Sequence, residues 1–363
     1  MPDRIPLVDV KGQFRALIPE LKERFAEVLE SGVYILGPNV EAFEQEAASY
    51  LGVPQTIGVA NGTDALVLVL DAMGIGPGDE VICPAFTFYA TAESIARRGA
   101  TPVFADIDPA TMNLDPEDAA ARITSRTRAI MPVHLFGRPA SLAPLAELGV
   151  PLVEDAAQAF GAAGTGTTGV ASTYSFFPTK NLFALGDGGL VGVTDEQLAE
   201  KVRMLRFHGS RDKVDFELVG YNSRLDELQA AALRLFLQHL DGWNRARREA
   251  AERYRELGMS DLVETPEDEP SHVYHLFVSR SPERDRIVAA LKEAGIGTAT
   301  YYTTPLHLQP ALRFLGYAEG SLPETERVAR DNFSVPLWAG ISAEQQERVV
   351  EVVRSAVGAG VPT

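Results

Sequence analysis

The sequence predicts an α/β fold: a large domain with a three-layer, mostly parallel sheet, followed by a smaller C-terminal α+β domain. Over the first two thirds of the 363 residues, short apolar runs alternate with segments of helical period. Such alternation is typical of a parallel sheet that is covered by helices. The runs are continuously apolar, as expected for strands that are buried on both faces. The alternation stops at residue 222, where a long helical segment begins, and the second domain is expected to follow.

The large domain begins with a regular succession of strands and helices. The strands are expected at 56–59, 80–83, 102–105, 128–131 and 151–154. The helices between them are expected at 63–73, 87–97, 116–122 and 142–148. In sheets of this kind, ligands bind outside the carboxyl ends of the strands. Side chains that directly follow these strands are therefore the first candidates for a functional site.

The segments beyond this succession complete the chain. Residues 222–256 contain no proline and a single glycine, so they predict one long helix or a broken pair. The small domain is expected to hold strands at 273–278 and 297–301 and helices at 282–294 and 343–356.

The N-terminal pattern differs from both of these regions. Residues 12–31 predict a separate amphipathic helix, packed on the small domain or on a second subunit. We therefore expect an N-terminal arm (1–30), a large domain (31–240) and a small domain (241–363).

Composition and charge exclude several classes of protein. The net charge of −17 and the isoelectric point near 4.8 give a surface that repels nucleic acid and anionic membranes. No run approaches the ~20 apolar residues of a membrane helix. The first residues lack the basic and apolar regions of a signal peptide. Cys83 is the single cysteine, so an intrachain disulfide is excluded and a cytoplasmic location is expected, with Cys83 in the core.

The first candidate site follows the strand at 56–59. Asn61, Gly62 and Thr63 stand between this strand and the next helix. Free backbone amides at a helix N-terminus bind phosphate, and the helix dipole assists them. Gly62 allows a close approach of the backbone, and Thr63 adds a hydroxyl. Taken alone, the turn is better interpreted as a plain helix cap.

Two further strand ends carry candidates. Phe88 could stack on a flat ring, although core packing is the commoner role of an aromatic residue at such a place. Asp155 is unusual at the buried end of an apolar strand unless it is paired or functional. Such a carboxylate can pair with a protonated pyridine nitrogen, and Gln158 can hydrogen-bond an oxygen of the same ring. The alternative is that Asp155 caps the following turn.

Lys180 lies on an aromatic, glycine-bounded loop, 175–189 (SFFPTKNLFALGDGG). Apolar walls lower the pKa of a lysine and favour the neutral amine, which forms an imine with an aldehyde. Ser175 is a further candidate donor to phosphate. A phosphate turn, a stacking aromatic, an acid for a ring nitrogen and an imine-forming lysine thus follow one another, each at a strand end. Together they point to pyridoxal 5′-phosphate (PLP), whose protonated ring is an electron sink.

With these residues, the chain resembles the DegT/StrS-like family of sugar aminotransferases, which are fold type I PLP enzymes. The resemblance covers nearly the whole length. The matching segments are 31–37 (SGVYILG), 61–66 (NGTDAL), 78–82 (GDEVI), 154–158 (EDAAQ), 175–180 (SFFPTK), 220–224 (GYNSR) and 305–307 (PLH). One departure is Phe183, where the family more often has glycine, and we expect its ring to narrow the entrance beside Lys180.

The resemblance implies a role for each candidate around the ring of the cofactor. Lys180 would form the imine, and Asp155 would pair with the pyridine nitrogen. Phe88 would stack on the ring, and Gln158 would lie near its 3′-oxygen. No metal ion is expected.

The resemblance also implies which residues bind the phosphate of the cofactor. Gly62, Thr63 and Ser175 would bind it within one chain. In such enzymes an asparagine reaches the phosphate in the neighbouring subunit, and here that residue is Asn222. A homodimer with shared active sites follows.

The reaction implied by the resemblance is a ping-pong transamination. Glutamate donates its amino group, with Lys180 moving the proton, and a keto group of a nucleotide-linked hexose then receives it. The segment 84–91 (PAFTFYAT) is more like that of enzymes that make 3-amino sugars, so C3 is favoured over C4. The candidate substrate contacts are Arg206, His208, Arg224 and His307. His134 also follows a strand, and either lines the site or belongs to the core.

Other functions are less well supported. A related PLP-dependent sugar dehydratase carries histidine in place of the lysine, so Lys180 argues against it. An aminotransferase acting on a cyclitol or another ketone stays open, because the cofactor motifs do not report the acceptor. A PLP-binding regulatory protein without turnover is disfavoured by the acidity and by the lack of a helix-turn-helix segment. A Rossmann-like binding module is disfavoured because no GxGxxG motif follows the first strand.

Overall fold

The structure is a computed structural model that describes residues 4–358. Residues 1–3, which entered the argument against a signal peptide, and residues 359–363 of the predicted small domain lie outside it. Within the described range, no helix is both long and apolar enough to cross a membrane.

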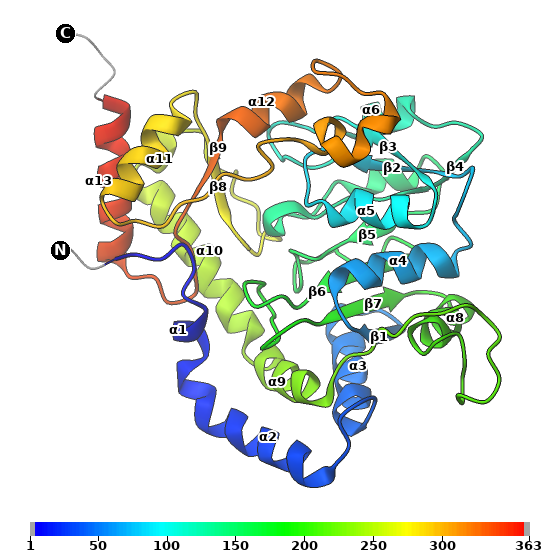
Figure 1. Ribbon diagram of the computed structural model, residues 1–363. Helices are drawn as coiled ribbons and strands as arrows, with labels where there is room; N and C mark the ends of the chain where they lie inside the picture. The colour runs from blue at the N-terminus through cyan, green and yellow to red at the C-terminus, as the bar shows by residue number, and fades with distance from the viewer. Residues whose placement is uncertain (1–3, 359–363) are drawn as a thin grey trace.

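The large sheet has its strands in the order β3-β2-β4-β5-β6-β7-β1 (Figure 1). Its two halves are joined by isolated parallel bridges from Ile130 to Leu152 and from Val133 to Asp155. β7 alone runs antiparallel to its neighbours, β1 and β6. The bounds are β1 (Gln55–Val59), β2 (Glu80–Pro84), β3 (Thr101–Ala105), β4 (Thr127–Ile130), β5 (Val153–Asp155), β6 (Ala171–Ser175) and β7 (Gly189–Val193). The mostly parallel sheet is confirmed, with five strands close to their predicted positions.

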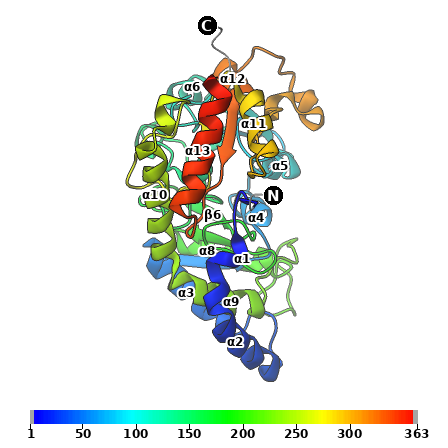
Figure 2. The same ribbon diagram turned by 90° about the vertical axis from the view of Figure 1, so that its left-hand side faces the viewer.

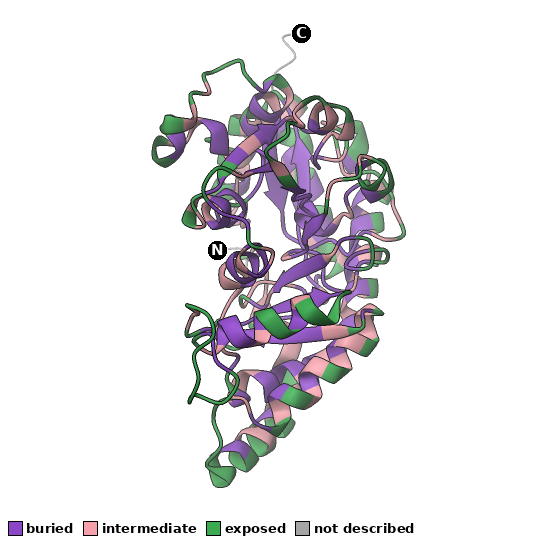
Figure 3. Ribbon diagram, turned by 90° about the vertical axis from the view of Figure 1, so that its right-hand side faces the viewer, coloured by how far each residue is buried: buried purple, intermediate pink, exposed green. Residues whose placement is uncertain are grey.

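Helices cover both faces of this sheet and so produce the three layers. α4, α5 and α8 lie on one face, where Leu66 joins Val81 of β2 in a core cluster. α3 and α9 cover β6 and β7 on the other face, where Phe43 and Tyr174 belong to one core cluster, and α6 and α7 cover β2 and β4 there. Figure 3 shows the strands buried between helices whose outer surfaces are exposed. The bounds are α3 (Pro38–Leu51), α4 (Gly62–Ala72), α5 (Ala90–Arg97), α6 (Pro116–Ala121), α7 (Leu142–Ala146), α8 (Glu196–Arg206) and α9 (Glu227–Leu237).

The unpaired backbone amides at the N-termini of α4 and α3 find hydrogen-bond acceptors in two different ways. At α4, the Asn61 side chain accepts a hydrogen bond of 2.8 Å from the Asp64 amide, as a local cap does. At α3, the cap comes from a distant element. The buried carboxylate of Glu227, on α9, accepts from the amides of Gly37 (2.9 Å) and Val40 (2.8 Å). A carboxylate there is also favoured by the helix dipole, so α9 fixes where α3 begins.

The C-terminal third forms a second core around an antiparallel pair of strands, β8 and β9. α10, α11 and α13 pack around this pair (Figures 1 and 2). Segment 222–256 is therefore a broken pair of helices, α9 and α10. The bounds are α10 (Leu240–Glu256), β8 (Phe277–Arg280), α11 (Arg284–Glu293), α12 (Pro323–Asp331), β9 (Asn332–Val335) and α13 (Ala343–Gly358). Short 3₁₀ turns lie at Leu135–Gly137, Met259–Asp261, Leu306–Leu308 and Pro310–Leu315.

Two predicted strands of this region are largely wrong. The expected strand at 273–278 starts only at Phe277, because Tyr274 has φ of 44°, which is incompatible with a strand. The expected strand at 297–301 is reduced to one bridge between Ala299 and Ser334. Segment 273–276 instead donates hydrogen bonds to the turn at Phe136 and Gly137, and the ring of Tyr301 contacts Phe136 in the same turn. Both segments therefore approach the site described below.

The N-terminal segment contains α1 (Val10–Phe14), a 3₁₀ turn (Arg15–Leu17) and α2 (Ile18–Ser31) rather than one helix. α2 lies along α9, and its buried Leu21 joins the same core cluster as Phe236 (Figure 1). The expectation that this helix packs on the small domain is therefore wrong for α2, and its alternative, packing on a second subunit, stays a prediction. The C-terminal core instead receives Ile5, which bridges to Ile296.

Candidate active site

Lys180 and Asp155 lie beyond the carboxyl ends of two neighbouring parallel strands. Asp155 is the last residue of β5, and Lys180 lies on the loop that follows β6. The Lys180 amine is enclosed by protein, although part of the side chain is accessible. Burial lowers the pKa of Lys180 from 10.5 to about 8, while the charge of Asp155 opposes the shift. Lys180 therefore gives up its proton far more readily than a surface lysine does.

Asp155 is a buried carboxylate with few partners. Burial raises its pKa, and the hydrogen bonds from Thr91 and Ala157 and the charge of Lys180 oppose that rise. The Thr91 hydroxyl donates to Oδ2 (2.8 Å) and the Ala157 amide to Oδ1 (3.2 Å). A carboxylate can accept about four hydrogen bonds. Asp155 thus keeps acceptor capacity for a protonated ligand.

The turn after β1 and the start of the Lys180 loop touch each other. The amides of Gly62 and Thr63 have no hydrogen-bond partner among the described residues, because the Asn61 side chain caps the next amide instead. A Cβ atom on Gly62 would lie 2.7 Å from the Cβ of Ser175, so glycine is required for this approach. Free amides and the Ser175 hydroxyl are thereby gathered at the start of α4, which suits a phosphate group.

Phe88 and Gln158 lie on the same edge of the sheet. The Phe88 side chain is 60% exposed, so core packing does not explain it. Gln158 is buried, and its amide is held at both ends. Its Oε1 accepts from the Phe136 amide (2.7 Å), and its Nε2 donates to the Tyr302 hydroxyl (3.1 Å).

The loop that carries Lys180 is anchored directly after the lysine. The Asn181 amide donates to the Asn244 side chain (2.7 Å) and to the Val273 carbonyl (2.8 Å). Phe183 is buried, and its ring packs on that of Phe236 at 4.8 Å between centroids. The expectation that Phe183 narrows the entrance beside Lys180 is therefore wrong, because its ring points into the core.

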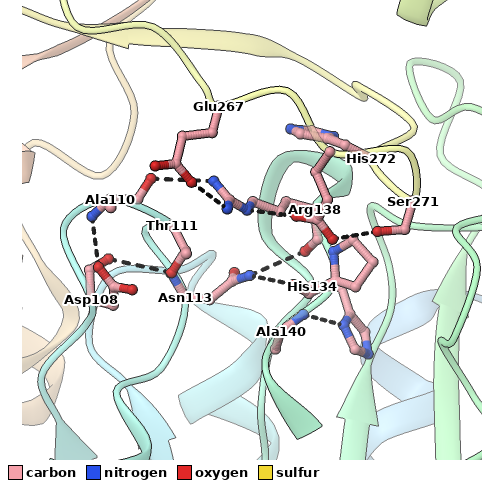
Figure 4. A network of polar contacts seen from close by, with 12 residues as sticks. Asp108, Ala110, Thr111, Asn113, His134, Arg138, Ala140, Glu267, Ser271 and His272 are labelled. Carbon is pink, nitrogen blue, oxygen red and sulfur yellow. Dashed lines mark hydrogen bonds and ion pairs between the residues drawn. The ribbon is translucent and has the colours of Figure 1, made fainter.

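His134 belongs to the interior of the protein. Its Nδ1 accepts from the Ala140 amide (2.9 Å), so its Nε2 bears a proton and faces Glu154 (2.9 Å). Figure 4 shows His134 and Ala140 in a polar network that also includes Arg138 and Glu267, which form an ion pair. The core interpretation of His134 fits these contacts.

Two of the four candidate substrate contacts are engaged elsewhere. Arg206 pairs with Glu44 and donates to the Gly58 carbonyl (2.7 Å). His307 is 1% exposed and pairs with Glu326 (3.1 Å). These contacts give both residues structural positions, which does not fit the prediction that they contact substrate.

The remaining candidates are two accessible basic side chains, and an accessible amide lies beside them. His208 and Asn222 are exposed and Arg224 is partly exposed, and no side-chain hydrogen bond or ion pair occupies them within the described range. The neighbouring Ser223 hydroxyl accepts from the Ala60 amide (3.2 Å), so Asn222 lies near the turn that contains Gly62. That Asn222 serves a second subunit stays a prediction.

Two residues of the site were missed by sequence reasoning. Thr91 stands one helical turn after Phe88, and that spacing was a signal that could have been used. Tyr302 is 144 residues from Gln158, and no local pattern links the two.

Comparisons with known proteins agree with this geometry. The family model of the DegT/DnrJ/EryC1/StrS aminotransferases matches residues 16–354. A "Pleiotropic regulatory protein" of Geobacillus stearothermophilus is 48% identical, with 96% of this chain and 97% of that protein covered. A dTDP-3-amino-3,4,6-trideoxy-alpha-D-glucose transaminase of Streptomyces venezuelae is 44% identical, with 97% of this chain and 96% of that protein covered.

A solved structure matches over the full fold. The S. venezuelae protein DesV, in complex with a ketimine intermediate, superposes with a TM-score of 0.94 at 43% identity, covering 99% of this chain and 100% of that one. The fold is therefore that of the fold type I aminotransferases, as the sequence predicted. The chain belongs to the DegT/DnrJ/EryC1/StrS aminotransferase family.

Proposed function

We propose that this protein is a PLP-dependent aminotransferase that transfers an amino group from glutamate to a keto group of a nucleotide-linked hexose, at C3 rather than C4. One observation carries the proposal: an enclosed lysine whose pKa is lowered to about 8 faces a buried, under-coordinated carboxylate across two adjacent parallel strands. A solvated surface lysine has neither feature.

The residues present fit PLP as a cofactor. The free amides of Gly62 and Thr63 and the hydroxyl of Ser175 would hold the phosphate. Asp155 would accept a hydrogen bond from the protonated pyridine nitrogen, and the exposed ring of Phe88 would cover the cofactor ring. When bound, PLP supplies an electron sink that stabilises negative charge on a neighbouring carbon.

The contribution of the protein to the reaction then depends on the protonation states of Asp155 and Lys180. Asp155 stays an anion next to a cation, because a charge-assisted pair in a dry site is strong. Lys180 at pKa about 8 is close enough to neutral pH to lose and regain a proton at its Nζ, as a general acid–base group must. Its loop is fixed by Asn181 and Phe183, so the amine returns to one position after each transfer.

Substrate class and regiochemistry rest on the relatives and on charge. The protein from S. venezuelae is named for a 3-amino sugar linked to dTDP, which favours a nucleotide sugar and C3 here. Arg224 and His208 are the accessible groups that could meet a diphosphate on a chain with a net charge of −17. A cyclitol or another ketone is the alternative acceptor.

A second subunit completes the site in this proposal. Large apolar side chains are exposed near the site and on the 207–221 loop, and an interface would cover them. They are Phe88, Phe177, Leu185, Val214, Phe216, Leu218 and Val219. Asn222, at the end of that loop, would reach the phosphate site of the partner. Mixing the inactive variants Lys180→Ala and Asn222→Ala should restore activity in verified heterodimers, since one intact site forms.

The test of the proposed function uses absorbance and a half-reaction. The purified protein with PLP should absorb near ~420 nm, as an imine of the cofactor does. Glutamate should convert that band and release one equivalent of 2-oxoglutarate per site, whereas a binding protein without turnover would leave glutamate unchanged. Lys180→Ala should remove the band and Lys292→Ala, at an exposed lysine, should keep it. A borohydride-reducible imine in Lys180→Ala would overturn the assignment.

A further inference from the structure

The side-chain amide of Gln158 has a fixed orientation. Its acceptor end must face Phe136, because a backbone amide can donate only to Oε1 (2.7 Å). Its NH₂ end therefore faces Tyr302, and one N–H is donated to the Tyr302 hydroxyl (3.1 Å). Gln158 is 7% exposed, so few other partners can compete for it. The second N–H of the amide is left for one more acceptor.

Both partners of Gln158 have an unusual backbone. Phe136 has φ of 56° and Tyr302 has φ of 50°, in the left-handed region that residues with a Cβ rarely adopt. Their rings stack nearly in parallel, with 10° between planes and 6.1 Å between centroids. Phe86 meets the Tyr302 ring edge-on at 5.3 Å. These two non-glycine residues pack on each other and bond to the same amide. Strained backbone of this kind is concentrated at functional sites, so the position of the Gln158 amide is expected to matter for function.

The O–H group of Tyr302 donates no hydrogen bond to another described residue. It accepts from Gln158 and makes no other hydrogen bond among the described residues, so it is able to donate. Tyr302 also comes from the C-terminal third, whereas Gln158 and Phe136 belong to the large sheet. Tyr302 therefore brings the C-terminal third of the chain into contact with Phe86 and Phe136 at the edge of the site.

We propose that Tyr302 is a positioning residue, which sets the Gln158 amide so that its second N–H points at the phenolic oxygen of the cofactor ring. This inference rests on the proposed function, and specifically on Gln158 lying near that oxygen. A donor at the phenolate stabilises its negative charge. The deprotonated state of the bound imine–phenol pair is then favoured, and its pKa is held down.

The experiment titrates the visible absorbance of the PLP-loaded protein with pH. Tyr302→Phe removes only the hydroxyl and should raise the pH midpoint by roughly half a unit to one unit, as expected for loss of one hydrogen bond of ordinary strength. It should also weaken PLP binding to the cofactor-free protein by roughly three- to tenfold. Gln158→Ala should raise the midpoint at least as far.

Tyr301→Phe is the matched control. Tyr301 is the preceding residue, and its ring also contacts Phe136, at 5.5 Å, but Gln158 bonds Tyr302. Its midpoint and PLP affinity should equal those of the wild type. Adding Tyr302→Phe to Gln158→Ala should cause no further shift, because the hydroxyl acts through that amide.

Three results would be decisive against this inference. They are a wild-type midpoint in Tyr302→Phe, an equal shift in Tyr301→Phe, and full additivity in the double variant. A wild-type protein that binds no PLP is a different outcome, since it overturns the proposed function itself. Thermal unfolding of each cofactor-free variant shows whether a change in binding merely reflects loss of folding.

Discussion

Glu154 and Asp155 are adjacent on β5, and both are buried carboxylates, yet their surroundings are opposite. Glu154 accepts hydrogen bonds from His134 and from three backbone amides, which come from Gly166 (2.6 Å), Thr168 (3.2 Å) and Gly169 (2.7 Å). The Asp155 carboxylate accepts only from Thr91 and Ala157 in the described structure. Burial acts to raise both pKa values, but the partners of Glu154 lower its pKa overall, whereas the pKa of Asp155 stays raised.

The difference separates a structural acid from one held for a ligand. Successive residues of a strand point to opposite faces, so one side chain meets the donor-rich loop at 166–169 and the other meets Lys180. A carboxylate with all its acceptor positions filled stabilises the fold and has no capacity for more. A buried carboxylate with few hydrogen-bond donors destabilises the fold until a cationic ligand binds to it. Such carboxylates are typical of functional sites.

The largest effect should come from Glu154→Gln, which keeps the shape but turns one oxygen into a donor. Donors already surround both oxygens, so the new NH₂ group faces either the Gly166 amide and His134 or the amides of Thr168 and Gly169. The free energy of unfolding of the cofactor-free protein should fall by about 3 kcal/mol or more. Urea unfolding monitored by circular dichroism measures it.

The pH dependence of that loss supplies its control. The folded-state pKa of Glu154 lies below its ordinary value of 4.5, so its stabilisation is present above pH 4.5 and is lost as the pH falls through the folded pKa. The difference in unfolding free energy between the wild type and Glu154→Gln should therefore become smaller in acid. A difference in unfolding free energy that stays constant as the pH is lowered below 4.5 and through the acid range would contradict the ionised state of Glu154.

Asp155→Asn is the matched change on the other face, and it should affect activity instead of stability. Loss of the carboxylate removes the partner of the ring nitrogen, so transamination should fall by roughly 100-fold or more, about 2.7 kcal/mol. The unfolding free energy of the cofactor-free protein should change by under about 1 kcal/mol, because asparagine carries no buried charge. Steady-state kinetics and urea unfolding, run on both variants, test the comparison. Equal stability losses in the two variants would break it.

The sequence allowed the functional role of Asp155 to be predicted, but not the structural role of Glu154. Asp155 could be predicted as functional because an acid at the end of an apolar strand requires a partner, and Lys180 offered one. The role of Glu154 depends on the loop at 166–169 and on His134, which are distant along the chain. The hydrogen-bond donors reach the Glu154 carboxylate only after the 166–169 loop has folded over it. A local sequence pattern therefore does not predict them.

The same limit explains which parts of the fold were predicted. Strands β1 to β5 of the large sheet are continuously apolar because they are buried on both faces, and these five were predicted to within about two residues. The segment at 273–276 was misjudged because Tyr274 is held in a left-handed conformation by tertiary contacts. Phe183 was misjudged for a similar reason, since its direction is set by Phe236 on α9. Tyr302 carried no signal at all.

The acid–base behaviour of Lys180 sharpens the comparison further. In the cofactor-free protein, the labelling of Lys180 by an amine-reactive reagent should rise with pH through a midpoint of about 8. Asp155 raises the pKa of Lys180, so Asp155→Asn should move the midpoint lower, by roughly one unit or about 1.4 kcal/mol. Mass spectrometry of the labelled peptides gives the midpoint, with exposed Lys292 as the internal reference. An upward shift would show that Asp155 does not bear charge beside the lysine.

The smallest expected effect lies at Thr91, and it tests why Asp155 remains charged with so few partners. The single hydroxyl proton of Thr91 goes to Asp155, so in the contact of 3.3 Å with Thr87 the donor must be Thr87. Thr91→Val removes a donor and raises the pKa of Asp155 further, which should cost about 1 kcal/mol, or roughly fivefold in PLP affinity. Thr91→Ser keeps the hydroxyl and should stay near wild type, and Thr87→Val, one step further away, should lose less. If Thr91→Ser lost as much affinity as Thr91→Val, packing of the methyl group would explain the effect and the hydrogen bond to Asp155 would not.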